Sequence, residues 1–215
     1  WRVITHPNLH PFLGYRSQPE PMLISPWCHH GNIADYLERK PGLSRLDKLR
    51  LICQAACGLE HLHSRTPPIC HSNLKPQNVL INDRLEVVLS DFGMDLLLEA
   101  EEWWTMIKEP RYWDFEYLAP ELLTGENSRR TQETDVFAFG GLVLAAMSGE
   151  PPFHGLPASH IILHIATNRQ PNPEQHPELP SSDPLWSLMR GCWSETPKAR
   201  STMQEVVREV SLHGS

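Results

Sequence analysis

Apolar residues recur at helical spacing in several stretches of the chain. From about Leu46 to Ser64 they alternate in steps of three and four, and the run Thr66-Pro67-Pro68 follows. This pattern predicts a long amphipathic helix that ends before the prolines. Ile33, Tyr36 and Leu37 predict a shorter helix of the same kind.

The second half of the chain predicts three more helices. Val136 to Met147 is apolar on all sides, which is typical of a fully buried helix. Asp183-Pro184 has the form of an N-cap with proline at the first helical position. A last amphipathic helix carries apolar residues at 203, 206, 207 and 210, and Ser201-x-x-Gln204 before it has the form of a capping box.

Short apolar runs predict strands between these helices. Val79–Ile81 and Val87–Leu89 are continuous apolar runs, and Phe12–Tyr15 and Met22–Ser25 flank prolines 19 and 21. The pattern therefore predicts mostly helices with a few short strands.

Composition changes this picture little. With 215 residues the chain can bury a substantial core, and its net charge of −7 disfavours nucleic acid as a partner. The longest apolar stretch is shorter than the roughly twenty residues of a membrane span. Five cysteines, an odd number, without a secretion signal indicate reduced thiols and a cytoplasmic location. The chain opens on Trp1 without an initiator Met, so we expect a piece of a longer protein.

A possible metal site lies on the long predicted helix. Cys53, Cys57 and His61 share one helical face, but a zinc site would need a fourth ligand and a polar setting. A small apolar helix face is the favoured interpretation.

The candidate chemistry lies in two polar stretches beside the central strands. The first is Cys70-His71-Ser72-Asn73-Leu74-Lys75-Pro76-Gln77-Asn78, and the second is Ser90-Asp91-Phe92-Gly93. They resemble the protein-kinase catalytic loop, His-Arg-Asp-Leu-Lys-Pro-x-Asn, and the Asp-Phe-Gly magnesium motif. One departure matters most, because Asn73 stands where the family has its catalytic Asp.

Three later motifs occur in family order. Ala119-Pro120-Glu121 resembles the Ala-Pro-Glu motif, and Asp135-Val136-Phe137-Ala138-Phe139-Gly140 resembles the start of the large lobe's central helix. Cys192-Trp193-x-x-x-Pro197-x-x-Arg200 resembles a late segment of tyrosine and tyrosine-kinase-like kinases. The resemblance covers nearly all of the chain and is greatest to the tyrosine-kinase-like group, with a serine/threonine-type loop at Lys75.

The resemblance implies an α+β, protein-kinase-like fold and a division of the chain into lobes. Residues 1–27 would end the small lobe, residues 28–32 would form the hinge, and residues 33–215 would form the mostly helical large lobe. Trp27 and Cys28 would then lie against the nucleotide. The Gly-rich loop and the strand-3 lysine of the family are absent from these residues.

The resemblance also implies roles for single residues. Asp91 and Asn78 would hold Mg²⁺ on ATP, because both offer hard oxygen ligands, and Lys75 would neutralise charge near the transferred phosphoryl group. Asn73 can orient a hydroxyl group but cannot accept its proton near neutral pH.

Other matched positions would be structural. His71 would brace the Asp-Phe-Gly turn, and Asp135 would accept backbone N–H groups of the catalytic loop. Glu121 and Arg200 would form a buried ion pair. Ser72 replaces the family arginine that holds a phosphorylated activation loop, which argues against switching through this position.

The aromatic residues between Trp103 and Tyr117 have two interpretations. Packing of the activation segment onto the large lobe is favoured over a partner surface.

Two functional hypotheses remain open. The first is a catalytically impaired, kinase-like signalling protein that acts as a scaffold or allosteric partner of another protein. The second is an active serine/threonine kinase whose small lobe lies outside this sequence. ATP and Mg²⁺ would be cofactors if the nucleotide site survives.

Overall fold

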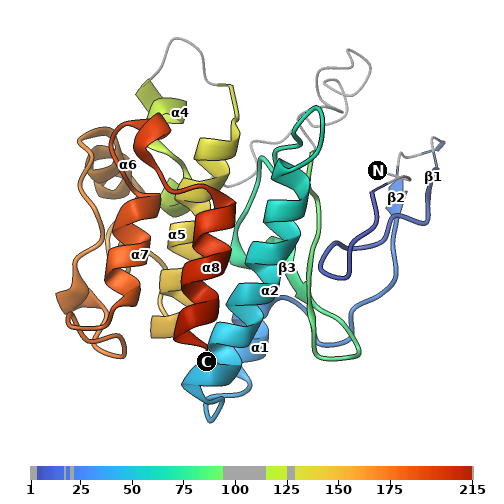
Figure 1. Ribbon diagram of the computed structural model, residues 1–215, viewed down its shortest axis with the longest axis horizontal. Helices are drawn as coiled ribbons and strands as arrows, with labels where there is room; N and C mark the ends of the chain where they lie inside the picture. Colours follow the sequence, from blue (N-terminus) through green and yellow to red (C-terminus); the bar gives the residue numbers. More distant parts are fainter. Residues whose placement is uncertain (1–3, 17, 20–21, 94–114, 125–128, 215) are drawn as a thin grey trace.

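The computed structural model describes residues 4–16, 18–19, 22–93, 115–124 and 129–214. Three long helices form its centre and run side by side in Figure 1: α2 (Arg45–His63), α5 (Gln132–Ser148) and α8 (Met203–His213). Helix α2 packs against both α5 and α8. It begins where the Ser44 side chain accepts the backbone N–H of Asp47, and it ends just before the predicted proline run.

The shorter helices surround this centre. Their bounds are α1 (Ile33–Glu38), α4 (Pro120–Thr124), α6 (Ala158–Ala166) and α7 (Leu185–Cys192). Single 3₁₀ turns are η1 (Pro76–Asn78), η2 (Phe115–Tyr117), η3 (Pro173–Gln175) and η4 (Pro197–Ala199).

Helix α5 is buried around most of its circumference, as its apolar pattern predicts. Two glycines allow neighbouring aromatic rings to lie directly against its backbone. A Cβ atom at Gly140 would lie 2.6 Å from Nε1 of Trp193, and one at Gly141 would lie 2.9 Å from the Tyr117 ring. Any larger residue at these positions would push the neighbouring rings off the helix.

The strands form two antiparallel pairs. Strands β1 (Gly14–Arg16) and β2 (Met22–Ile24) make a hairpin that stands apart from the helices at the right of Figure 1. Strands β3 (Val79–Ile81) and β4 (Val87–Leu89) pair beside α2, at the bounds that their apolar runs predict.

The segment before β1 is fixed to the helical centre. Asn8 accepts the Leu89 N–H through its backbone oxygen, and its side chain donates to Val87 O. This segment crosses α2 at Gly58, where a Cβ atom would lie 2.6 Å from the Asn8 oxygen. The close approach explains a glycine inside a long helix, where it otherwise costs about 1 kcal/mol.

Several predicted boundaries are wrong by one or two residues. The capping box of α8 is formed by Thr202 and Glu205, not by Ser201 and Gln204. Helix α7 has Pro184 at its N-cap, although Asp183 Oδ1 still accepts the Leu185 N–H. Strand β1 begins at residue 14 rather than 12.

The predicted ion pair between Glu121 and Arg200 is present and bidentate. The two guanidinium nitrogens lie 2.6 and 2.8 Å from the carboxylate oxygens. Arg200 also donates to Ser194 O and Glu133 O, and its guanidinium stacks over the Phe137 ring. This side chain therefore joins α4, the start of α5 and the segment before α8.

We predict that Arg200→Ala lowers the free energy of unfolding by roughly 2–4 kcal/mol, because four donated hydrogen bonds are lost and Glu121 is left without its cation. Lys198→Ala is the matched control, since the Lys198 side chain is 85% exposed in its pair with Glu133 and should contribute less than about 1 kcal/mol. Urea unfolding measures both. Equal effects of the two substitutions would contradict the assignment.

Candidate functional site

The polar loop between α2 and β3 lies beside the end of β4, so the two stretches singled out by sequence come together. Asn78 makes this connection. Its side-chain Nδ2 donates to Asn73 O at 2.7 Å, and its backbone oxygen accepts both the N–H and the hydroxyl of Ser90. The base position at 73 is thereby tied to the residue directly before Asp91.

Asp91 and Asn78 fit the chemistry of a magnesium site. Asp91 has a left-handed backbone, with φ of 56°, and its exposed carboxylate has no hydrogen-bond partner within the described ranges. Because Asn78 uses Nδ2 for Asn73, its Oδ1 is left to act as a ligand. Two hard oxygen donors suit Mg²⁺, which takes its remaining ligands from water and phosphate. No group of three or more His, Cys, Asp or Glu side chains in the described part of the chain could hold a metal.

The backbone of the loop is anchored by Asp135, as predicted. This carboxylate is 2% exposed and accepts the N–H groups of His71 at 2.6 Å and Ser72 at 2.8 Å. Its third partner is His63 Nε2 at 2.9 Å. His63 falls within the long helix predicted from about Leu46 to Ser64, but a contact across 72 residues has no local signal in the sequence.

A second missed residue lies on the other side of Ser72. The guanidinium of Arg130 donates to the Ser72 backbone oxygen. Ser72 is buried with φ of 72°, and its own hydroxyl has no hydrogen-bond partner in the part of the chain that the structure describes. Arg130 stands outside the predicted helices and outside the family motifs, so only the fold brings it to the loop.

His71 contacts the Asp-Phe-Gly turn, but not through its ring nitrogens. Its backbone oxygen accepts the Gly93 N–H at 3.2 Å, and its ring packs edge-on against Phe92. Both ring nitrogens are buried and have no hydrogen-bond partner within residues 4–93, 115–124 and 129–214 as far as these are described, and burial lowers the pKa of the imidazole. The ring is therefore neutral and held by packing.

The remaining candidates lie around this centre. Lys75 is half-buried and directly precedes the η1 turn. Trp27 is 79% exposed, while Cys28 is half-buried with its sulfur 3.7 Å from His10 Nε2. Burial raises the pKa of the Cys28 thiol, so it stays protonated at neutral pH.

The possible metal site at Cys53, Cys57 and His61 is not supported. The His61 ring stacks on His6 at 4.7 Å, and burial raises the pKa of Cys57 to about 11. A thiol of this kind is a poor ligand, which agrees with the favoured interpretation of a packed helix face.

The structure describes only two of the aromatic residues between Trp103 and Tyr117. Trp103, Trp104, Tyr112 and Trp113 lie outside the described residues. Tyr117 is buried against Gly141, and Phe115 packs on the small cluster of Phe153, Ile161 and Ile165. For these two aromatics the packing interpretation is confirmed.

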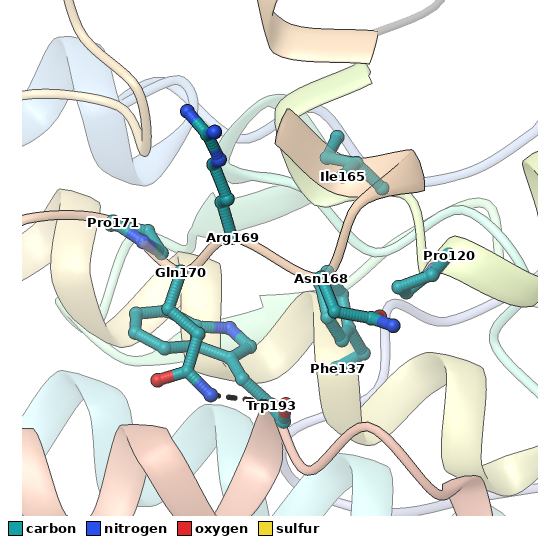
Figure 2. Close-up of a pocket in the computed structure, with 8 residues that line it drawn as sticks. All are labelled: Pro120, Phe137, Ile165, Asn168, Arg169, Gln170, Pro171 and Trp193. Carbon is teal, nitrogen blue, oxygen red and sulfur yellow. Dashed lines mark hydrogen bonds between the residues drawn. The ribbon is translucent and has the colours of Figure 1, made fainter. Parts of the chain in front are cut away.

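A small hollow lies elsewhere in the fold, between α4, α5 and the end of α6. Figure 2 shows Phe137 and Trp193 in its wall, with Gln170 donating to the Trp193 oxygen and Arg169 pointing away. Its volume of about 10 Å³ is room for roughly one water molecule. None of the candidate residues lines it.

A catalytic-type loop joined through an asparagine to an Asp-Phe-Gly turn, and anchored on the first turn of a buried helix, is the arrangement that the resemblance to protein kinases implies. A family model described as protein tyrosine and serine/threonine kinase matches residues 2–210. The chain therefore belongs to the protein kinase family, and the expected tyrosine-kinase-like type and α+β fold are confirmed.

Individual relatives agree with the family. Human receptor-interacting serine/threonine-protein kinase 3 is 31% identical over 90% of this chain. Serine/threonine-protein kinase VIK of Arabidopsis thaliana is 27% identical over 96% of it. Ankyrin repeat and protein kinase domain-containing protein 1 of Mus musculus is 29% identical over 77% of it. The chain spans 38%, 47% and 23% of these three proteins.

We predict that His71 makes the fold sensitive to acid. Because its folded pKa is lowered, the unfolded chain takes up a proton at higher pH than the folded one. The associated stability is fully present above about pH 6.5, the unfolded value, and is lost as the pH falls below it. In His71→Leu this loss shrinks, by at most about 1.4 kcal/mol per pH unit.

Urea unfolding between pH 5 and 8 measures the effect. Some acid sensitivity remains in the variant, because burial also lowers the pKa of His176. His160→Leu is the control, since His160 is exposed and should leave the profile unchanged. A profile of His71→Leu that matches the unaltered protein would show that the ring is not held neutral.

Proposed function

We propose that this chain carries the large lobe of a kinase-like signalling protein whose phosphoryl transfer is impaired, and which acts as a scaffold or allosteric partner of another protein. In this proposal residues 1–27 end the small lobe, residues 28–32 form the hinge and residues 33–215 form the large lobe. The observation that carries the proposal is Asn73 at the catalytic-base position of a loop whose backbone is held by hydrogen bonds to Asp135 and Asn78.

The chemistry of Asn73 supports impairment. A carboxylate at this position accepts the proton of the attacking hydroxyl, and an amide does not. General-base assistance contributes about 10²–10⁴ in rate, which is roughly 3–5 kcal/mol of barrier. Asn73 keeps the backbone contact with Asn78, so its substitution removes the base without removing the loop.

Nucleotide binding is a separate matter from turnover. In the proposed site Asp91 and Asn78 would hold Mg²⁺, and Lys75 would add positive charge beside the phosphates. The metal would neutralise charge on the transferred group. Trp27 and Cys28, in the proposed hinge, would contact the base of the bound nucleotide.

An apolar surface is exposed on the part of the chain that the proposal assigns to the small lobe. Side chains of the β1–β2 hairpin are between 36% and 68% exposed at positions 13, 15, 22, 23 and 24, and Trp27 is exposed beside them. An apolar surface of this kind is typical of protein contact. Within the described helices, none is both long and apolar enough to cross a bilayer.

A second function is favoured by the same site. Asp91, Asn78 and Lys75 are all present, and phosphoryl transfer depends largely on positioning and metal electrostatics. An active serine/threonine kinase that works with Asn73 is therefore the alternative.

We predict that ATP with Mg²⁺ raises the melting temperature of the complete chain. At one hundred times the dissociation constant the ligand adds about 2.7 kcal/mol, or roughly 5–11 °C for a domain of this size. The shift should need Mg²⁺ and should disappear in Asp91→Asn. Asp83→Asn is the matched control, because Asp83 lies on the β3–β4 turn, paired with His29. A shift that survives in Asp91→Asn would exclude this site.

We predict that Asn73→Asp raises phosphoryl-transfer turnover by about 10²–10⁴. Gln77→Glu adds the same charge to an exposed position of the same loop and should raise nothing. Turnover is measured on a general protein substrate in the complete chain. If the unaltered protein already turns over as fast as Asn73→Asp, the impaired-kinase proposal fails and the active kinase takes its place.

A further inference from the structure

We propose that Arg130 is a positioning residue for the catalytic loop, which it holds through the peptide group that joins Ser72 to Asn73. The inference rests on the proposed function only in naming residue 73 as the base position. The contact itself is a property of the fold.

Ser72 is held from both sides by charged side chains of one helix end. Asp135, in the first turns of α5, accepts its backbone N–H at 2.8 Å, and Arg130, just before α5, donates to its backbone oxygen. The Thr131–Thr134 capping box fixes the chain between these two residues. Residues at the start of α5 therefore form hydrogen bonds to both backbone polar groups of Ser72.

These two hydrogen bonds restrain a residue with an unfavourable backbone conformation. Ser72 has φ of 72°, a left-handed conformation that is unfavourable for a residue with a Cβ atom. Its buried hydroxyl has no hydrogen-bond partner among the described residues, so the side chain adds no hydrogen bond there that would restrain the loop. The two bonds to the α5 end keep this residue in its unusual conformation.

The consequence falls on Asn73. The peptide group before it is fixed by Arg130 through Ser72, and the peptide group after it is fixed by Asn78 Nδ2 at 2.7 Å. With both neighbouring peptide planes held, the direction of the side chain at 73 is set. The orientation of any group at the base position thus depends on a residue 57 positions away in the sequence.

The positive charge beside this backbone comes from a different sequence position than in the family motif. The motif that this loop resembles has arginine at the position of Ser72, whereas here the guanidinium beside that backbone comes from position 130. A charged donor makes a stronger bond to a carbonyl than a neutral one. Arg130 therefore supplies a cation to the loop from outside the motif.

The experiment compares Arg130→Met with Arg129→Met in the complete chain by hydrogen exchange. Arg129 is the adjacent exposed arginine and has no partner in the described part of the chain. In Arg130→Met we expect amides of residues 70–78 to exchange about tenfold faster or more, while α2 and α8 keep their protection. Arg129→Met should match the unaltered protein.

Two results would overturn the inference. One is loop exchange in Arg130→Met that equals that in Arg129→Met. The other is faster exchange throughout α2 and α8, which would mean that Arg130 supports the fold in general.

A second measurement links the contact to chemistry. In the Asn73→Asp background, Arg130→Met should lower kcat about tenfold or more with little change in the KM for ATP, because the base is misplaced while Asp91 remains. An equal kcat with and without Arg130 would overturn the inference. If the unaltered protein already turns over as fast as Asn73→Asp while Arg130→Met still loosens the loop, the proposed function fails and the inference stands.

Discussion

The arrangement of the whole site depends on one buried carboxylate, that of Asp135. A buried charge of this kind is costly unless hydrogen bonds satisfy it, and here three donors do so: two loop N–H groups and His63. Its place in the first turns of α5 adds the favourable field of the helix N-terminus. The catalytic loop takes its shape because its backbone completes the coordination of this carboxylate.

This dependence separates the fold of the loop from its chemistry. Asn73 contributes its backbone oxygen to the bond with Asn78, while its side chain makes no hydrogen bond to any other described residue. An asparagine and an aspartate can therefore occupy position 73 on the same backbone. The same reasoning applies to Ser72, whose backbone groups are used and whose hydroxyl is not. A catalytic-type loop with this backbone and an asparagine at position 73 are compatible for this physical reason.

Sequence predicted the parts of the fold that local patterns determine. The β3 and β4 runs are found at the expected residues because each is apolar, short and bounded by polar positions. The capping box of α8 was misplaced because Ser201-x-x-Gln204 and Thr202-x-x-Glu205 overlap in sequence. The structure selects the second, since the Ser201 N–H bonds to Gly191 O and Ser201 lies against Gly191.

The site was predicted where a motif carries it and missed where only the fold does. Asp91, Asn78 and Asp135 stand in recognisable spacings, so resemblance located them. His63 and Arg130 reach the loop across 72 residues to Asp135 and 58 residues to Ser72. Neither contact follows from helical or strand periodicity, because long-range contacts depend on how elements pack. The start of α5 is therefore the place where sequence reasoning about this chain was least complete.

That same helix end is also where two distant parts of the chain meet. Glu133 accepts Arg200 through its backbone oxygen and Lys198 through its side chain, and Arg200 in turn holds Glu121 after the activation segment. Arg130 and Asp135, on either side of Glu133, hold the catalytic loop. A partner can shift an equilibrium only by binding one arrangement more tightly than another. In the proposed allosteric role, a partner that contacts α4 or the segment before α8 would act on the loop through this helix end, since Arg200 bonds to Glu133 O and the loop anchors Arg130 and Asp135 lie on either side of Glu133. The route requires no base at position 73, so an allosteric role is physically independent of catalysis.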